Sequence, residues 1–163
     1  MRNDNRKWTS PVGFDLATGL SVREIKGSRQ FLVSGVDVQR RYASNLITWP
    51  DVVVSDNCAL SLRRDQVLLV NGPHLPHGYN ASTGLAATDM SSGLVILELS
   101  GPDAWTVLKR GAEIRLDTPS RSVARRVFGI DVMLYGYRDA TCFRMHVPRA
   151  MAVALHQHVR AEL

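Results

Sequence analysis

The stretch Leu97-Glu98-Leu99-Ser100-Gly101-Pro102-Asp103-Ala104 predicts a strand that turns directly into a helix. Residues 94–100 are rich in Leu, Val and Ile, which is typical of a buried strand. Gly101 ends that strand, and Pro102 suits the first turn of a helix because its φ is fixed and no N–H is needed there. Asp103 lies where the helix dipole favours a negative charge. The sequence therefore predicts a strand-to-helix hinge in an α+β protein.

The residues after this hinge predict the other elements of the second half of the chain. The helix that follows has an apolar stripe, formed by Ala104, Val107, Leu108 and Ala112. Residues 130–135 and 141–147 flank the segment 136–140, and this pattern predicts a hairpin. Pro148 precedes a last predicted helix over residues 149–160, whose apolar face consists of Met151, Leu155 and Val159.

The first half of the chain predicts the same order of elements. Phe31-Leu32-Val33 indicates a strand, and the four-residue spacing of apolar side chains over residues 36–46 indicates a helix. Residues 58–62 and 67–70 then predict a hairpin with a polar tip, and the Pro- and His-containing segment 73–80 predicts a loop.

An internal repeat relates the two halves. The segment 31–37 matches residues 97–103 at an offset of 66, because both contain a Ser-Gly pair followed by Asp. Each half thus reads as strand, helix and hairpin. We therefore expect an N-terminal arm over residues 1–20, a first α+β lobe over 21–80 and a second, related lobe over 81–163, packed as one unit.

Length and composition fit a small globular protein. The chain has 163 residues, of which 45% are hydrophobic, and it contains no run of 18 apolar residues that could form a membrane span. Its polar N-terminus lacks the apolar core of a secretory signal, so we expect a cytoplasmic location. Cys58 and Cys142 lie far apart and form no metal-binding motif.

The net charge of +5 comes mainly from scattered arginines. No basic helix with interleaved aromatic residues is present, so the sequence predicts no nucleic-acid partner. Arginine pairs well with carboxylates and is enriched at protein interfaces. An acidic protein partner is therefore the expectation, with an Arg-rich nucleic-acid-binding module as a remaining alternative.

The sequence motifs that are typical of common enzyme classes are absent. The sequence lacks GxGxxG, the P-loop, the GxSxG elbow and HExxH, and no histidine pair has metal-ligand spacing. We therefore predict no catalytic residue and no metal site. The candidates for a pocket are Asp89 and Ser91, in a polar turn before the hinge strand, and Asp117 after the hinge helix. A backbone turn is the alternative for Asp89 and Ser91, and a helix cap or an ion pair with Arg121 or Arg125 is the alternative for Asp117.

Three side chains are candidates for a protein interface: Trp105, Arg125 and Arg149. Trp105 follows the hinge and could also stack on a flat ligand or lie in the core.

Two stretches resemble a known family. Asp89-Met90-Ser91-Ser92-Gly93 followed by Ser100-Gly101-Pro102-Asp103-Ala104 is similar to a signature of the aminomethyltransferases, which include the glycine-cleavage T-protein. Residues 122–125, 129–132 and 143–155, which contain Val147-Pro148-Arg149-Ala150-Met151-Ala152, resemble the end of the gamma subunits of heterotetrameric sarcosine oxidases. The resemblance covers residues 85–163 well and residues 1–80 weakly, and it implies two related α+β lobes.

The resemblance also implies a role in a complex. Alpha, beta and delta subunits would be the partners, and they would carry FAD, FMN, NAD, tetrahydrofolate and zinc, with no cofactor in this chain. The catalytic aspartate of the large transferases follows the hinge glycine by 14 residues, where this chain has Arg115, and the folate-enclosing part of those enzymes is not present.

We therefore expect a non-catalytic gamma-type subunit of a flavin-dependent complex that demethylates sarcosine or another N-methyl amino acid. Such a complex passes the one-carbon unit to tetrahydrofolate in a partner chain. A stand-alone folate-binding aminomethyltransferase-like protein is the alternative.

Overall fold

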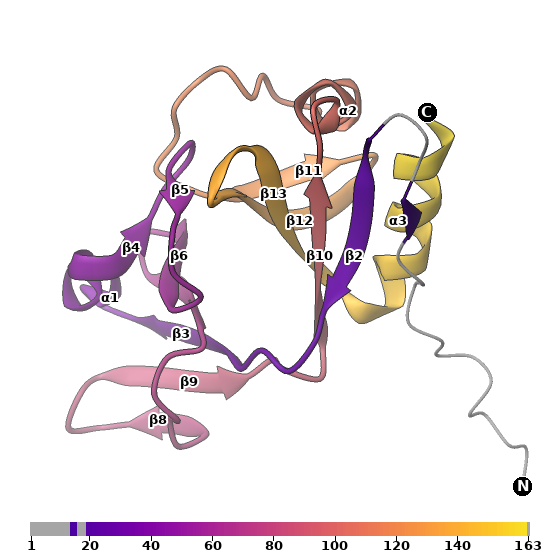
Figure 1. Cartoon of the computed structure of the whole chain (residues 1–163). Coiled ribbons are helices and arrows are strands. Elements are labelled where there is room, and N and C mark those ends of the chain that lie inside the picture. Colours follow the sequence, from indigo (N-terminus) through magenta and orange to yellow (C-terminus); the bar gives the residue numbers. More distant parts are fainter. Residues whose placement is uncertain (1–13, 16–18, 163) are drawn as a thin grey trace, which may run out of the picture.

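The computed structural model describes residues 14–15 and 19–162, and these residues form two β-sheets with three α-helices (Figure 1). Most of the expected arm over residues 1–20 lies outside the described residues. The first sheet has the order β1-β2-β10-β13-β12-β11, with β5 beside β12. Its strands are β1 (Phe14–Asp15), β2 (Ser21–Ile25), β5 (Val52–Val53), β10 (Leu94–Ser100), β11 (Ala124–Val127), β12 (Ile130–Tyr137) and β13 (Asp139–Pro148).

The second sheet has the order β4-β6-β7-β3-β9-β8. Its strands are β3 (Gln30–Gly35), β4 (Leu46–Ile47), β6 (Cys58–Arg63), β7 (Gln66–Val70), β8 (Gly78–Asn80) and β9 (Leu85–Asp89). Most neighbouring strands are antiparallel, but β4 pairs with β6, and β5 with β12, in parallel. This mixture of strands and helices is the predicted α+β class.

Three apolar clusters hold the sheets and helices together. One lies between the sheets and includes Leu60 and Leu68 of the second sheet with Ile96 and Tyr135 of the first. The opposite face of the first sheet packs against α2 (Ala104–Gly111) and α3 (Ala152–Ala161), whereas that of the second sheet packs against α1 (Val38–Arg41). Among residues 14–15 and 19–162, no helix has the length and apolar character needed to cross a membrane.

The predicted hinge is present at the end of β10. This strand spans Leu94–Ser100, as expected, and α2 begins at Ala104, whose N–H donates to the Gly101 carbonyl at 3.1 Å. Gly101 has φ of +130°, and a Cβ there would collide with the carbonyl oxygen of Gly19. The glycine is therefore required both by its backbone conformation and by the segment that passes beside it.

Both predicted hairpins are confirmed, with longer arms than expected for the second one. Strands β6 and β7 are joined by Arg64 and Asp65, and β12 and β13 by Arg138, which has φ of +65°. A register shift lies between Gly136 and Tyr137, so the segment 136–140 forms mostly strand and only a one-residue turn.

The helix predicted over residues 36–46 is wrong. Only α1 is helical in the α sense, and a 3₁₀ turn, η2 (Ala43–Asn45), follows it. Leu46 instead pairs with Ala59 of β6, because a sheet partner satisfies its backbone groups and withdraws it from the helix. The apolar side chains at that spacing, Val38, Tyr42 and Leu46, still pack on the core of the second sheet, but they do so from α1, a turn and β4 rather than from one helix.

The last helix is shorter than predicted. A 3₁₀ turn, η3 (Arg149–Met151), precedes α3, and Met151 is 41% exposed. The buried face of α3 consists of Ala152, Leu155 and Val159. The 3₁₀ turn changes the angular spacing of its residues, which moves Met151 away from the face that the four-residue pattern predicted.

Strands from either side of residue 80, the predicted boundary between the lobes, pair with one another. Strand β2 lies beside β10 in the first sheet, and β9 lies beside β3 in the second. Figure 1 shows β2 running along β10, while the connection to β3 leads away to the other sheet. Each sheet is therefore completed by a strand from the other predicted lobe.

Candidate functional site

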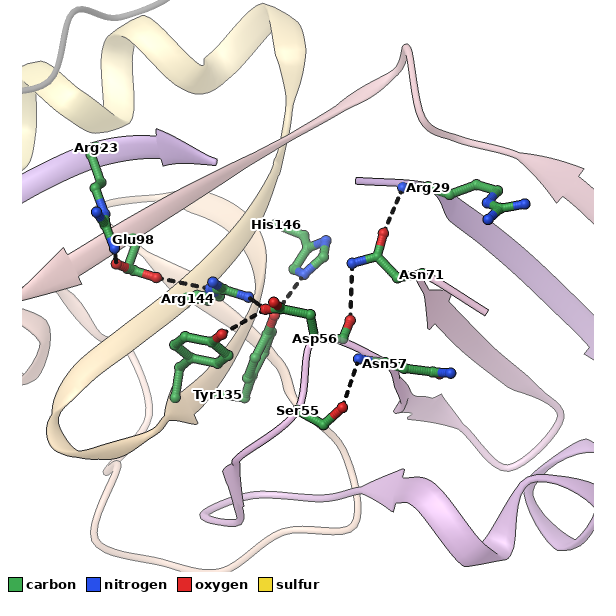
Figure 2. A network of polar contacts seen from close by, with 11 residues as sticks. Arg23, Arg29, Ser55, Asp56, Asn57, Asn71, Glu98, Tyr135, Arg144 and His146 are labelled. Atoms are coloured by element: carbon green, nitrogen blue, oxygen red, sulfur yellow. Dashed lines mark hydrogen bonds and ion pairs between the residues drawn. The ribbon is translucent and has the colours of Figure 1, made fainter. Parts of the chain in front are cut away.

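A buried carboxylate, Glu98, lies in the middle of β10 between two guanidinium groups (Figure 2). Arg23 of β2 and Arg144 of β13 are its direct cross-strand neighbours, so all three side chains share one face of the sheet. Nε of Arg23 donates to Oε1 of Glu98 at 2.8 Å, and Nε of Arg144 donates to Oε2 at 2.9 Å. The side chains of Glu98 and Arg144 are only 3% and 6% exposed, so each charge depends on the other.

Asp56, in the connection between β5 and β6, extends this network to the surface. Nη1 of Arg144 and the hydroxyl of Tyr137 both donate to Oδ1 of Asp56, at 2.8 and 2.6 Å. These two hydrogen bonds lower the pKa of Asp56. Burial alone would lower the pKa of Arg144, but its hydrogen bonds to Asp56 and Glu98 raise it. Arg144 therefore stays charged and bridges two carboxylates.

Asn71 links the β5–β6 connection, which contains Asp56, to the start of the second sheet. Its Oδ1 accepts from the Arg29 N–H at 2.9 Å, and its Nδ2 donates to the Asp56 carbonyl at 3.0 Å. Figure 2 shows this bridge on the opposite side of Asp56 from the arginine–carboxylate row. The polar contacts thus join the β2–β3 connection, the β5–β6 connection and the first sheet.

His146 lies two residues after Arg144 on β13, is completely buried and forms a second chain of hydrogen bonds. One ring nitrogen, Nδ1, lies 2.6 Å from Oε1 of Gln30, and Nε2 lies 3.1 Å from the Tyr135 hydroxyl. Because an amide oxygen can only accept, Nδ1 carries the proton and Nε2 accepts from the tyrosine. Burial and the nearby Arg144 lower the pKa of His146 to about 3. The ring is therefore neutral and fixed as one tautomer.

This histidine predicts a pH dependence of stability. An unfolded histidine has a pKa of about 6.5, so between pH 6.5 and 3 the unfolded chain takes up a proton that the folded chain excludes. The free energy of unfolding should therefore fall with decreasing pH in this window, by up to ~1.4 kcal/mol per pH unit from this group. Urea unfolding of His146→Gln at several pH values between 4 and 7 should lack this contribution.

The exposed loop residue His77 provides the control for that measurement. His77→Gln should keep the pH profile of the unsubstituted protein. Parallel profiles for His146→Gln and the unsubstituted protein would contradict the assignment of the neutral buried ring.

The two cysteines belong to the same inter-sheet core. Burial raises the pKa of the Cys58 thiol to about 12 and that of the Cys142 thiol to about 11. Both thiols therefore remain protonated at neutral pH. Such thiols are weak nucleophiles at neutral pH. In the part of the chain that the structure describes, no group of three or more His, Cys, Asp or Glu side chains could hold a metal ion.

An aromatic pocket opens on the other side of the first sheet. Trp49, Trp105 and Phe143 stack in a row, with ring centres 6.1 and 5.7 Å apart, and line a cavity of about 320 Å³. Val52 of β5, which is 44% exposed, lies at its edge. Nζ of Lys109 lies 5.9 Å from the Trp105 ring centre. This pocket presents an apolar, aromatic surface, and its lining also includes the carboxylate residue Asp139.

The pocket candidates from the sequence do not come together. Asp89 accepts from the Ser91 N–H at 2.8 Å, and the Ser91 hydroxyl accepts from the Gln30 N–H at 2.9 Å. Hydrogen bonds with the side chain and the N–H of Ser91 lower the pKa of Asp89. Both residues lie before the start of β10. Asp117 lies beyond its far end, is half exposed and pairs with Lys109 at 3.8 Å rather than with Arg121 or Arg125.

The two arginines proposed for an interface have different surroundings. Arg125 is buried and donates to the carbonyls of Ser122 and Ala124, and its guanidinium lies 5.4 Å from the Trp49 ring centre. Arg149 is exposed, and its Nε donates to the Ser92 carbonyl at 2.7 Å. Arg125 thus packs against Trp49 of the aromatic row, whereas Arg149 is hydrogen-bonded to the turn before β10.

Sequence analysis missed Glu98, Arg144 and His146. A usable signal was present, because each of these polar residues interrupts an otherwise apolar strand. A charge at a position that the strand pattern assigns to the core needs a partner of opposite charge. Identifying that partner required the strand register.

Comparisons with known proteins identify solved structures that have a similar fold. No family model and no curated protein matches the chain. Among solved structures, heterotetrameric sarcosine oxidase from Corynebacterium sp. U-96 in complex with pyrrole 2-carboxylate is similar, with a TM-score of 0.68 and 18% identity over 91% of this chain and 86% of that one. Aminomethyltransferase T of the glycine cleavage system from Bartonella henselae has a TM-score of 0.51 and 15% identity, over 85% of this chain but 44% of that one. The chain therefore has an aminomethyltransferase-like α+β fold, which is also found in a chain of a heterotetrameric sarcosine oxidase.

Proposed function

We propose that this chain is a non-catalytic, gamma-type subunit of a cytoplasmic complex of the sarcosine oxidase type. The observation that carries the proposal is the extent of the structural match. The match covers 91% of this chain and 86% of the sarcosine oxidase chain, whereas the match to the aminomethyltransferase covers 44% of that enzyme. Correspondence over most of both chains favours the role of a small subunit over that of a whole transferase.

In this proposal the chemistry belongs to the partner chains. Alpha, beta and delta subunits would carry the flavins, NAD, tetrahydrofolate and zinc, and would oxidise an N-methyl amino acid and transfer the one-carbon unit. The chemistry of this chain supports the division of roles. The buried carboxylate Glu98 is paired with Arg144, and both thiols have pKa values far above neutrality. This chain would contribute a folded scaffold to the complex and a surface that binds the larger subunits.

The aromatic pocket is the surface that we propose for the larger partners. Trp105 is a half-buried aromatic residue in a concave setting, and tryptophans in such settings often dominate binding energy. The chain's net charge of +5 favours a partner whose surface is acidic. An apolar partner side chain would fill the cavity while acidic groups surround it.

Trp105→Ala tests this surface. Removal of the indole should weaken the association with the large subunits by at least about 2 kcal/mol, or roughly 30-fold, because a central aromatic contact is lost. Native purification of the tagged chain, with identification of the co-purifying chains, measures the complex, and binding of the isolated chain to the recovered partners measures the affinity.

Tyr79→Ala is the matched control, since Tyr79 is 71% exposed and lies on β8 of the second sheet. It should leave the complex intact. Loss of the complex in Tyr79→Ala with retention in Trp105→Ala would contradict the assigned surface. Purification of the unsubstituted chain without any partner, together with heat on titration with tetrahydrofolate, would instead support the stand-alone folate-binding alternative.

We also infer that the two sheets derive from one strand–helix–hairpin unit, as the sequence repeat predicted. Both hinge glycines lie against the carbonyl of another glycine: Gly101 against Gly19, and Gly35 against Gly84. Each of these outer glycines is preceded by Thr and followed by Leu. The hinge N–H also donates to a residue of the following hairpin in both halves, Asp65 at 2.9 Å and Thr141 at 3.0 Å. These matched contacts support a duplication.

A further inference from the structure

We propose that the outer face of the second sheet holds a binding site for a small organic carboxylate with an apolar body. This site lies on the opposite sheet from the aromatic pocket, and the proposal does not depend on the subunit role.

The site exists because the two sheets are covered unequally. The outer face of the first sheet packs against α2, with 8 residues, and α3, with 10 residues. The described helical cover on the outer face of the second sheet is α1, with 4 residues, followed by a 3₁₀ turn. Beside α1 a cavity of about 440 Å³ remains. This volume falls within the range of roughly 300–1,000 Å³ that is usual for small-molecule sites.

The walls of the cavity are continuous with the core of the second sheet. Val33 of β3 and Ala87 of β9 belong to its buried cluster, and they are 0% and 7% exposed. Tyr42, after α1, and Leu75, in the 73–77 loop, pack against that cluster from two sides. Strands β3 and β9, the residue after α1 and the 73–77 loop thus line a concave, largely apolar space. Such a shape fits the body of a small molecule better than the flat surface of a protein partner.

Arg41 supplies the polar anchor. It lines the cavity at the end of α1, and its Nη2 donates to the Thr83 carbonyl at 2.7 Å. That contact orients the guanidinium, and within the described residues Arg41 forms no ion pair with a carboxylate. A guanidinium pairs with a carboxylate through two parallel hydrogen bonds. One oriented arginine above an apolar cavity therefore selects a carboxylate attached to an apolar body.

The test uses a matched pair of probes, 2-naphthoate and its neutral analogue 2-naphthamide, with the full chain. Backbone amide spectra recorded during each titration report both the location and the affinity. We expect naphthoate to shift the signals of Tyr42, Thr83 and Ala87, and to bind at least about tenfold more tightly than naphthamide, because a charged hydrogen bond is lost with the amide. Equal affinities, or shifts confined to the Trp105 pocket, would overturn the proposal.

Two substitutions localise the anchor and the cavity. Arg41→Gln should weaken naphthoate binding by about tenfold or more, whereas Arg40→Gln, at the exposed neighbouring position, should leave it unchanged. Ala87→Leu should prevent binding by filling the cavity floor. Amide spectra of the three variants verify the fold. An equal effect of Arg40→Gln and Arg41→Gln would mean only general charge attraction, and unchanged binding in Ala87→Leu would exclude this cavity.

Discussion

Glu98→Gln is expected to lower the free energy of unfolding by about 3 kcal/mol or more. The substitution preserves the size of the side chain but removes the charge that faces Arg144, whose side chain is 6% exposed. A buried charge that loses its partner typically destabilises a protein by about 3–5 kcal/mol. Asp56 remains beside Arg144 and holds the effect near the lower end of this range. Urea unfolding followed by circular dichroism measures the difference.

Arg23→Gln is the control for this prediction. It removes the other ion pair of Glu98, but the side chain of Arg23 is 58% exposed and water can replace the contact. Exposed pairs contribute at most about 1 kcal/mol. The difference between the two variants therefore isolates the buried Glu98–Arg144 pair. A similar loss in both variants would show that burial does not control the network.

Gly101→Ala is expected to destabilise the protein by about 3 kcal/mol or more. Two effects add: φ of +130° strains any residue with a side chain, and the new Cβ would meet the Gly19 carbonyl oxygen and the Cα of Leu20. Relief would require the chain before β2 to move away from the hinge. The thermal midpoint and the urea midpoint should both fall, and hydrogen exchange should increase in β2 and β10.

Gly27→Ala separates strain from collision. Gly27 also has a positive φ, +78°, but an added Cβ there would meet no atom within 4 Å. This variant should lose only about 1 kcal/mol. If Gly101→Ala were no worse than Gly27→Ala, the close approach of Gly19 would not constrain the hinge.

The strands and turns of this chain were predictable because their signals are local. Apolar β-formers identified β10 and both hairpins, and the Gly-Pro pair located the start of the hinge helix to within two residues. The α1 region shows the limit of such reasoning. Its four-residue spacing indicated a longer helix, but Leu46 found a strand partner in β6, and a contact between distant segments overrode the local preference.

The candidate site was less accessible from the sequence. Trp105 was among the residues predicted for an interface, but its neighbours in the aromatic row, Trp49 and Phe143, lie 56 residues before it and 38 after it. Asp89 and Ser91 were also chosen from their residue types, and in the structure they form a backbone turn. Residue type alone could not tell a pocket from a turn, because both use the same polar side chains.

Local rules of backbone conformation were thus sufficient for the hinge, the hairpins and the α+β class. The exchange of β2 and β9 between the sheets, the burial of Glu98 beside Arg144, and the cavity left uncovered by α1 depend on pairing between distant strands. A strand presents its side chains to both faces of its sheet, and its own sequence does not determine which other segments pack against each face. The pairing of distant strands depends on the free energy of the whole packed core, in which each buried charge must be paired with an opposite charge.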